Sequence, residues 1–382
     1  MPKVARVTQL KLVFLALGAA ASLIPASIPS ISSALAVEVG ALTPAVPAMF
    51  GGLLSAVMLV PYLEPKVRSG IQMRASLFLI ASGVVASGMA SSAEVFVLGS
   101  FVTGLGFGAA EVIGTSAAKE PGVATSNVLL KLNAAFAMSA LTTPIIHIAM
   151  SNLIQTNASF WLIGLLVIAV AYAYRERPKM TRSNASLVKL DAGAAVFSLA
   201  VLCYVGAEAL IAGWSSVLVS ELGALSYQFA AIGGSAFWAL FAIGRIAASV
   251  LTPKFIKEQQ ALLFWPALAA TSLLVVSFAW NEVSPTTVFI AFAVAAIAAG
   301  PCYALIVGIA LDTQRQQNPT AFTSFLILCG AAGGFIFPLV AQAFDRISLL
   351  ALFGGVGFFA VAVFTILGTK LGSKQTIVLE GS

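Results

Sequence analysis

The segment Arg175–Lys189, Arg-Glu-Arg-Pro-Lys-Met-Thr-Arg-Ser-Asn-Ala-Ser-Leu-Val-Lys, divides the chain near its middle. It holds five basic residues against a single acid, Glu176, and the sequence on either side is almost continuously apolar. A basic hydrophilic run cannot lie in the hydrocarbon of a bilayer, and basic loops stay on the cytoplasmic side of a membrane. We therefore predict that this segment is a cytoplasmic linker between two halves of a polytopic membrane protein.

The composition agrees with a membrane protein. Of the 382 residues, 60% are hydrophobic and only 9% are charged, which is far outside the range of soluble domains. The formal net charge of +6 does not indicate a nucleic-acid partner, because the basic residues are spread over many short loops rather than gathered in one patch. The expected partners are the lipid bilayer and a small solute.

The apolar runs predict the membrane-spanning helices. A bilayer is crossed by about 20 apolar residues in a helix, and the sequence contains twelve runs of about that length. Loops between them are mostly shorter than ten residues, which leaves no room for a domain outside the membrane. The predicted spans are 11–35, 43–63, 71–91, 94–117, 124–152, 157–174, 192–219, 225–252, 260–280, 284–311, 319–344 and 348–369.

The basic residues predict the orientation. With the N-terminus inside, eighteen of the 20 Lys and Arg residues fall in cytoplasmic segments, and only Arg245 and Arg346 do not. The even number of spans then puts both termini in the cytoplasm. We expect a multi-pass protein of the inner membrane of a bacterial-type cell, acting as a monomer.

The predicted fold class is an all-α integral membrane protein of twelve transmembrane helices in two pseudo-symmetric six-helix bundles. The bundles are predicted at 1–174 and 191–382, joined by the basic linker 175–190. An offset of 194 residues maps Gly106 onto Gly300 and Pro144 onto Pro338, and it brings Gly51 within a residue of Gly244. Two repeats of this kind suit a transporter that rocks around a central site.

Prolines and glycines inside the spans predict kinks and close helix contacts. Proline is tolerated in a membrane helix where neighbouring groups satisfy the freed carbonyl, and small residues four apart allow helices to approach closely. The glycines are interpreted as packing sites, with gating as the functional alternative. The prolines are Pro25, Pro29, Pro144, Pro301 and Pro338, and the glycine pairs are Gly104/Gly108 and Gly330/Gly334.

One carboxyl group lies deep inside an apolar span. Glu208 falls near the middle of 192–219, in Tyr204-Val-Gly-Ala-Glu208-Ala-Leu-Ile-Ala-Gly-Trp214. An ionisable side chain at that depth costs about 2.5–3.5 kcal/mol on insertion scales, so its presence indicates a function. A carboxyl that takes up and releases a proton is what a proton-coupled carrier needs; a permanently protonated carboxyl that pins two helices is the structural alternative. Tyr204 shares the helical face of Glu208, whereas Trp214 is turned away.

Four other polar positions inside the spans are candidates. Glu111 is a second proton or substrate site, or a carboxyl hydrated near the cytoplasmic end of its helix. Asn133 is polar enough to line a cavity. Arg245, after Gly244, is interpreted as a gating or structural residue that pairs with a helix-end carbonyl or an acid. His147 is interpreted as a hydrogen-bonded residue at the outer end of its span.

The sequence favours neither an enzyme nor a metal or cofactor protein. It has no Walker A motif for an ATP-driven pump, no nucleophile elbow and no zinc-protease helix motif. The three cysteines, Cys203, Cys302 and Cys329, are far apart in apolar segments, and there is one histidine. We expect no metal and no cofactor.

The whole chain resembles the major facilitator superfamily in its six-plus-six topology and basic central loop. The loop signature of that superfamily after its second helix survives as a remnant in Tyr62-Leu-Glu64-Pro-Lys66-Val-Arg68-Ser-Gly70, with the acid and base displaced. The resemblance implies transport by alternating access.

Three further segments are similar to the fucose-permease-like sugar–proton symporters. They are Tyr204-Val-Gly-Ala-Glu208 with Trp214, Gly104-Leu-Gly-Phe-Gly108 with Glu111, and Gly244-Arg245; Gly300-Pro301 adds a little. The resemblance implies that Glu111 matches a glutamate implicated in proton coupling, whereas the first span contains no acid to match the aspartate of that family.

The sequence therefore predicts a secondary active transporter that moves a small organic solute with protons as the coupling ion. Symport of a sugar-like or other polar metabolite is the first expectation, and a proton-driven exporter of drugs or metabolites is the alternative. A receptor or scaffold that transports nothing is the hypothesis from a different class.

Overall fold

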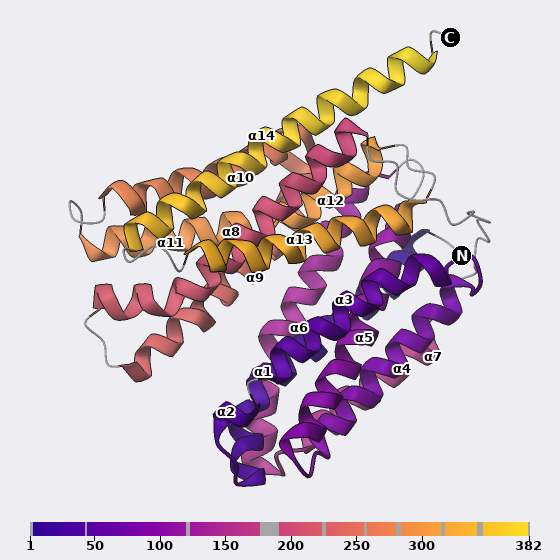
Figure 1. Cartoon of the computed structure of the whole chain (residues 1–382), viewed down its shortest axis with the longest axis vertical. Coiled ribbons are helices and arrows are strands. Elements are labelled where there is room, and N and C mark those ends of the chain that lie inside the picture. Colours follow the sequence, from indigo (N-terminus) through magenta and orange to yellow (C-terminus); the bar gives the residue numbers. More distant parts are fainter. Residues whose placement is uncertain are drawn as a thin grey trace. The chain divides into compact units, whose positions relative to one another are not determined.

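The computed structural model describes most of the chain as α-helices. The described residues are 3–42, 44–119, 123–175, 191–223, 227–255, 258–279, 284–314, 318–341 and 347–380. The predicted linker lies almost entirely outside them, and only Arg175 is described. All fourteen elements found within these ranges are α-helices (Figure 1).

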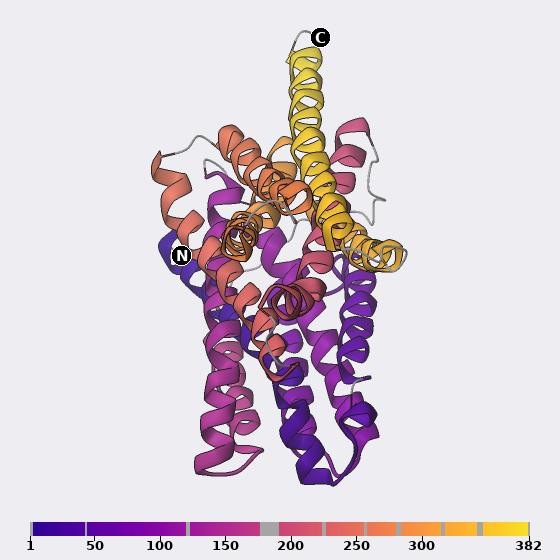
Figure 2. The same cartoon turned by 90° about the vertical axis from the view of Figure 1, so that its left-hand side faces the viewer.

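The first compact unit comprises Met1–Ala118, Lys131–Leu187 and Gln317–Ser324. In it α5 packs against both α3 and α4, α7 packs against α4, and α1 packs against α5 and α7. These helices run alongside one another in both views (Figures 1 and 2). The helix bounds are α1 Lys3–Leu35, α2 Val39–Leu42, α3 Ala45–Leu63, α4 Ser69–Gly88, α5 Ala93–Ala117, α6 Thr125–Leu153 and α7 Ala158–Ala173.

The second compact unit comprises Lys119–Leu130, Val188–Gln316 and Phe325–Ser382. In it α14 packs against α8 and α10, α9 packs against α8 and α11, and α12 packs against α8. The helix bounds are α8 Ala192–Gly223, α9 Tyr227–Phe255, α10 Glu258–Ala279, α11 Pro285–Ala299, α12 Cys302–Thr313, α13 Pro319–Ala341 and α14 Ile347–Glu380.

Two unbroken helices belong to both units. The first turns of α6, up to Leu130, belong to the second unit, and the rest of α6 belongs to the first. The first turns of α13, up to Ser324, belong to the first unit, and the rest belongs to the second. Each unit therefore contains the N-terminal turns of a helix that continues in the other unit.

The described helices are those of a multi-pass membrane protein. Ten stretches are long and apolar enough to cross a membrane, and two shorter apolar helices, Ala158–Ala173 and Ala236–Thr252, bring the number in the described residues to the twelve predicted. The span predicted at 284–311 is one of the ten, although it breaks at Gly300–Pro301 into α11 and α12. The break occurs because Pro301 has no N–H to donate to the preceding turn.

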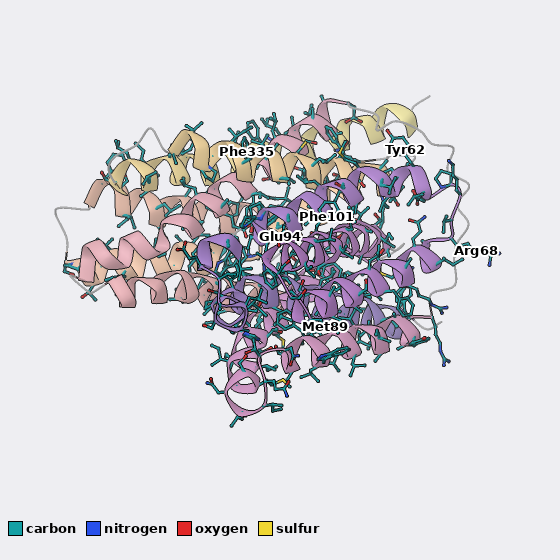
Figure 3. The ribbon with its side chains drawn as sticks, turned by 60° about the horizontal axis from the view of Figure 1, so that its bottom comes forward. Tyr62, Arg68, Met89, Glu94, Phe101 and Phe335 are labelled. Atoms are coloured by element: carbon teal, nitrogen blue, oxygen red, sulfur yellow. The ribbon has the colours of Figure 1, made fainter. Side chains whose placement is uncertain are left out.

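Several buried hydroxyls are satisfied within their own helix, and some large apolar side chains are exposed on the surface. The buried hydroxyls of Ser76, Ser87 and Thr103 each donate to the carbonyl four residues earlier in their own helix, at 2.7–2.9 Å. Tyr62 and Phe335 extend from the surface, where they are 68% and 69% exposed (Figure 3). Exposed apolar side chains of this size suit a surface that faces lipid.

In each unit, two glycines bring the backbones of a pair of helices into direct contact. In the first unit, a Cβ on Gly52 would clash with the carbonyl oxygen of Phe101, and a Cβ on Gly104 would clash with that of Met49. Met49 is three residues before Gly52, and Phe101 is three residues before Gly104. The contact between α3 and α5 is therefore reciprocal.

The second unit repeats this contact between α9 and α11. A Cβ on Gly244 would clash with the carbonyl oxygen of Ile297, and a Cβ on Gly300 would clash with that of Phe241. The spacing of three residues is the same as in α3 and α5. The structure supports the internal repeat and corrects its register, because the equivalents of Gly244 and Gly300 are Gly52 and Gly104 rather than the positions near Gly51 and at Gly106.

The predicted close contacts at the two glycine pairs have different outcomes. The contact of Gly104 is confirmed, and a Cβ on Gly108 would clash with the carbonyl oxygen of Leu53. Gly330 and Gly334 face the side chain of Val205 instead. A Cβ added to Gly330 or Gly334 would lie 3.0 or 3.3 Å from a methyl carbon of Val205. The backbone contact of α13 is at Gly333, where a Cβ would clash with the carbonyl oxygen of Leu202. Gly333 therefore lies on the face of α13 that packs against α8.

Candidate functional site

Glu208 lies on α8, one turn after Tyr204. The four-residue spacing puts both side chains on one face of the helix. Tyr204 is 0% exposed, whereas Glu208 is half-buried. The Tyr204 hydroxyl and the Glu208 side chain are hydrogen-bonded, and Arg245 of α9 interacts electrostatically with Glu208. The structure thus brings together three of the residues that the sequence singled out.

The break between α11 and α12 supplies acceptors for this cluster. Where a helix stops, its last carbonyls lose their backbone partners and need other donors. Three consecutive carbonyl oxygens at the break accept hydrogen bonds from side chains. Cys302 Sγ donates to Ala298 at 3.3 Å, Tyr204 Oη donates to Ala299 at 3.2 Å, and Arg245 Nε donates to Gly300 at 3.2 Å.

Arg245 is held from two sides. Its guanidinium carbon lies 4.4 Å from the centroid of the Phe241 ring, one turn earlier on α9, and its Nε binds the Gly300 carbonyl. The residue is 9% exposed. The expected pairing of Arg245 with a helix-end carbonyl is therefore present. Gly244 allows it, because the missing side chain lets α9 approach the end of α11.

This arrangement provides a partly exposed glutamate on a membrane helix and an arginine that interacts with it electrostatically. In a low-dielectric environment the cation favours the ionised carboxylate, and burial favours the neutral acid. Broken helices whose free carbonyls line an ionisable group are also a recurring feature of transport sites. The chemistry that the cluster supports is uptake and release of a proton at Glu208, or binding of a polar solute there.

The other predicted site residues lie on other helices or outside the described side chains. Glu111 of α5 is half-buried and Asn133 of α6 is buried, and both belong to the first unit and interact with neighbouring groups. Helix α8 continues past Trp214, but the side chain of Trp214 lies outside the described residues.

His147 is hydrogen-bonded, as predicted, and its side chain is buried. It is 1% exposed, with Nε2 2.8 Å from Ser30 Oγ and Nδ1 2.7 Å from Ser159 Oγ. Ser30 Oγ donates to the Ser27 carbonyl at 2.9 Å, so it accepts from His147 Nε2. His147 therefore joins α1, α6 and α7 through two side-chain hydrogen bonds.

A polar joint in the second unit was not found from the sequence. Asp312, in the last turn of α12, accepts from the backbone N–H of Thr125 at 2.6 Å and also bonds the Thr125 hydroxyl. The Lys119 ammonium donates to the Leu311 carbonyl. Burial lowers the pKa of the Lys119 amine, and the nearby Asp312 carboxylate opposes this shift in part. The sequence does show an acid, Asp312, at the end of one span and Thr125 at the start of another, but it does not show that the two meet.

A second polar contact, in the first unit, involves Glu64 from the remnant of the loop signature. Glu64, just after α3, accepts a hydrogen bond from the Thr320 hydroxyl at 2.8 Å, near the start of α13. Asn318 Oδ1 accepts from the N–H of Ala321 at 3.0 Å and caps the same helix. A carboxylate is stabilised at a helix N-terminus by the macrodipole.

Comparison with known proteins identifies the fold. No protein-family model and no curated protein matches the sequence. A variant of the E. coli fucose:proton symporter is 18% identical, with 95% of this chain and 98% of that chain covered and a TM-score of 0.78. The human organic anion transporter MFSD10 is 14% identical, with 97% and 100% covered and a TM-score of 0.72. The proton:xylose symporter XylE is 13% identical, with 96% and 95% covered and a TM-score of 0.72. The chain has the fold of the major facilitator superfamily.

Proposed function

We propose that the chain is a secondary active transporter that carries a small polar solute together with protons. The observation that carries this proposal is Glu208, a half-buried carboxyl inside a membrane helix, hydrogen-bonded to Tyr204 and facing Arg245. A membrane protein retains such a group at a cost of several kcal/mol, which a proton or solute site explains. Two of the similar structures are proton symporters, for fucose and for xylose.

Glu208 is the proposed proton site, and Tyr204 and Arg245 position it. Glu111 and Asn133 are the proposed contacts of the first unit, with Trp214 as a further contact on α8. Arg245 and Gly244 are the proposed gating residues, since they contact the break between α11 and α12. The proposal also includes the domain division and the orientation. The bundles are proposed at 1–174 and 191–382 with the linker between them, and both termini are proposed to lie in the cytoplasm of a bacterial-type cell.

The first experiment identifies the solute. Purified protein is screened by thermal shift against sugars, amino acids, nucleosides and cationic drugs. A compound that raises the melting temperature is then added to proteoliposomes that contain a pH-sensitive dye. Inward movement of protons with the compound supports symport. Outward proton flux driving uptake into inverted vesicles supports the exporter.

The second experiment tests Glu208. Glu208→Gln removes the ionisable group and retains the side-chain size, so we expect gradient-driven accumulation to fall to background while solute exchange without a gradient continues. Glu94→Gln is the matched control, because Glu94 is exposed at the start of α5. Unchanged accumulation by Glu208→Gln contradicts the proposed role.

A further inference from the structure

The Tyr204 hydroxyl faces two acceptors with a single hydrogen. It contacts the Ala299 carbonyl at the end of α11 at 3.2 Å, and it is hydrogen-bonded to Glu208 on its own helix. Hydrogen bonds between oxygens are usually 2.7–2.8 Å long, so the contact to Ala299 is a long one. A phenol has one O–H and cannot donate fully to both oxygens at the same time.

The protonation state of Glu208 decides which acceptor receives that hydrogen. An ionised carboxylate only accepts, and a charge-assisted hydrogen bond is about twice as strong as a neutral one. The Tyr204 hydrogen therefore goes to ionised Glu208. A protonated carboxyl donates its own hydrogen to the Tyr204 oxygen, which leaves the Tyr204 hydrogen for the Ala299 carbonyl.

Solvent access separates the roles of the two residues. Glu208 is half-buried, whereas Tyr204 is 0% exposed and packs against Tyr303 and Phe358, with ring centroids 6.2 and 6.1 Å away. Of the two residues only Glu208 has exposed surface, so we take Glu208 as the residue that the proton reaches and Tyr204 as the one that responds through it. The titratable and charged groups facing Glu208 and Tyr204 in the described residues are Arg245 from α9 and Cys302 and Tyr303 from α12.

We propose that Tyr204 is a positioning residue that couples protonation of Glu208 to the helix break, by moving its hydroxyl hydrogen between the Glu208 carboxylate and the Ala299 carbonyl. The inference rests on the proposed function, since it takes Glu208 as the proton site. The proton taken up forms an O–H bond on the Glu208 carboxylate, and no covalent bond of Tyr204 breaks. The uptake ties the end of α11 to α8, and release of the proton frees it. Arg245 keeps its bond to the next carbonyl, of Gly300, in both states.

The test is hydrogen–deuterium exchange of the break itself, which requires no solute. Peptides that cover 299–306 are followed in the purified protein at pH 5 and pH 8, after correction for the intrinsic pH dependence of exchange. In the natural protein we expect exchange to be roughly fivefold slower at pH 5, the ratio expected for one net hydrogen bond. Glu208→Gln should be slow at both pH values, because the amide donates to Tyr204 as the neutral acid does.

The decisive variant is Tyr204→Phe, which should exchange fast at both pH values. Tyr172→Phe is the matched control, because the ring of Tyr172 is 73% exposed and lies in the first unit, and it should behave as the natural protein does. If the pH dependence disappears in Glu208→Gln but persists in Tyr204→Phe, Glu208 is the proton site and the role of Tyr204 is wrong. If the pH dependence persists in Glu208→Gln, or is absent from the natural protein, the inference fails together with the proton site.

Discussion

Arg245 is held at the helix break by two contacts. It donates to a carbonyl that the helix break has deprived of its backbone partner, and it lies over an aromatic ring. We expect Arg245→Ala to destabilise the protein by about 1–3 kcal/mol, because the buried Gly300 carbonyl is left without this donor. Thermal unfolding in detergent measures the change.

The control for this prediction is Arg68→Ala. Arg68 is exposed just before α4, and surface substitutions usually change stability by less than about 0.5 kcal/mol (Figure 3). Equal melting temperatures for the two variants would show that Arg245 does not support the break.

Lys119 gives the protein a predictable pH response outside the membrane spans. Burial lowers the pKa of its amine in the folded protein, whereas the unfolded chain has the usual value of about 10.4. Between these two values the unfolded state binds more protons, so stability rises as the pH rises. We expect the melting temperature of the natural protein, relative to that of Lys119→Met, to increase from neutral to alkaline pH. Parallel pH profiles would contradict this assignment.

At the scale of the helices, adjacent glycines on α3 provide a matched pair. A Cβ on Gly52 would overlap the Phe101 carbonyl, whereas a Cβ on Gly51 has its nearest neighbour, a Phe101 ring carbon, at 4.0 Å. Replacing glycine by alanine inside a helix gains about 0.5–1 kcal/mol where there is space. We expect Gly51→Ala to raise the melting temperature and Gly52→Ala to lower it. The same sign for both variants would show that the contact between α3 and α5 tolerates a side chain.

The sequence predicted where the helices lie better than it predicted which faces meet. The length of each apolar run sets a membrane helix, and Pro301 was expected to kink the span 284–311. The sequence did not show that this span breaks there, because Pro25, Pro29, Pro144 and Pro338 lie inside unbroken helices. A membrane helix is apolar all round, and the pattern therefore does not distinguish Gly333 from Gly334. Only the structure shows that Gly333 faces the backbone of α8.

The side chains of the candidate site were predictable from the sequence, and the backbone groups that bind them were not. The spacing of Tyr204 and Glu208 placed them on one face, and the charge of Arg245 marked it as a partner for a carbonyl or an acid. The acceptors at Ala299 and Gly300 are backbone atoms, which have no signature in the sequence. Their position depends on α8, α9 and α11 being neighbours, which is a property of the packed unit.

At the scale of the whole molecule, the orientation can be tested with one pair of positions. Arg68 precedes α4 and Glu94 begins α5, so a single span separates the two labelled side chains (Figure 3). We expect a membrane-impermeant maleimide to label Glu94→Cys in intact cells and Arg68→Cys only in inverted vesicles. The unsubstituted protein is the control, because its three cysteines lie within helices. The reverse pattern would overturn the predicted orientation.

The reciprocal glycine contacts also restrict how the sequence can diverge. At Gly52, Gly104, Gly244 and Gly300 the space of the missing side chain is filled by a peptide oxygen of the facing helix. A large-to-small exchange on a neighbour can make room for a new side chain, but no exchange removes a peptide oxygen. Orthologues should therefore keep glycine at these four sites even where the adjacent residues have drifted, which makes the sites anchors for aligning the two halves of distant sequences.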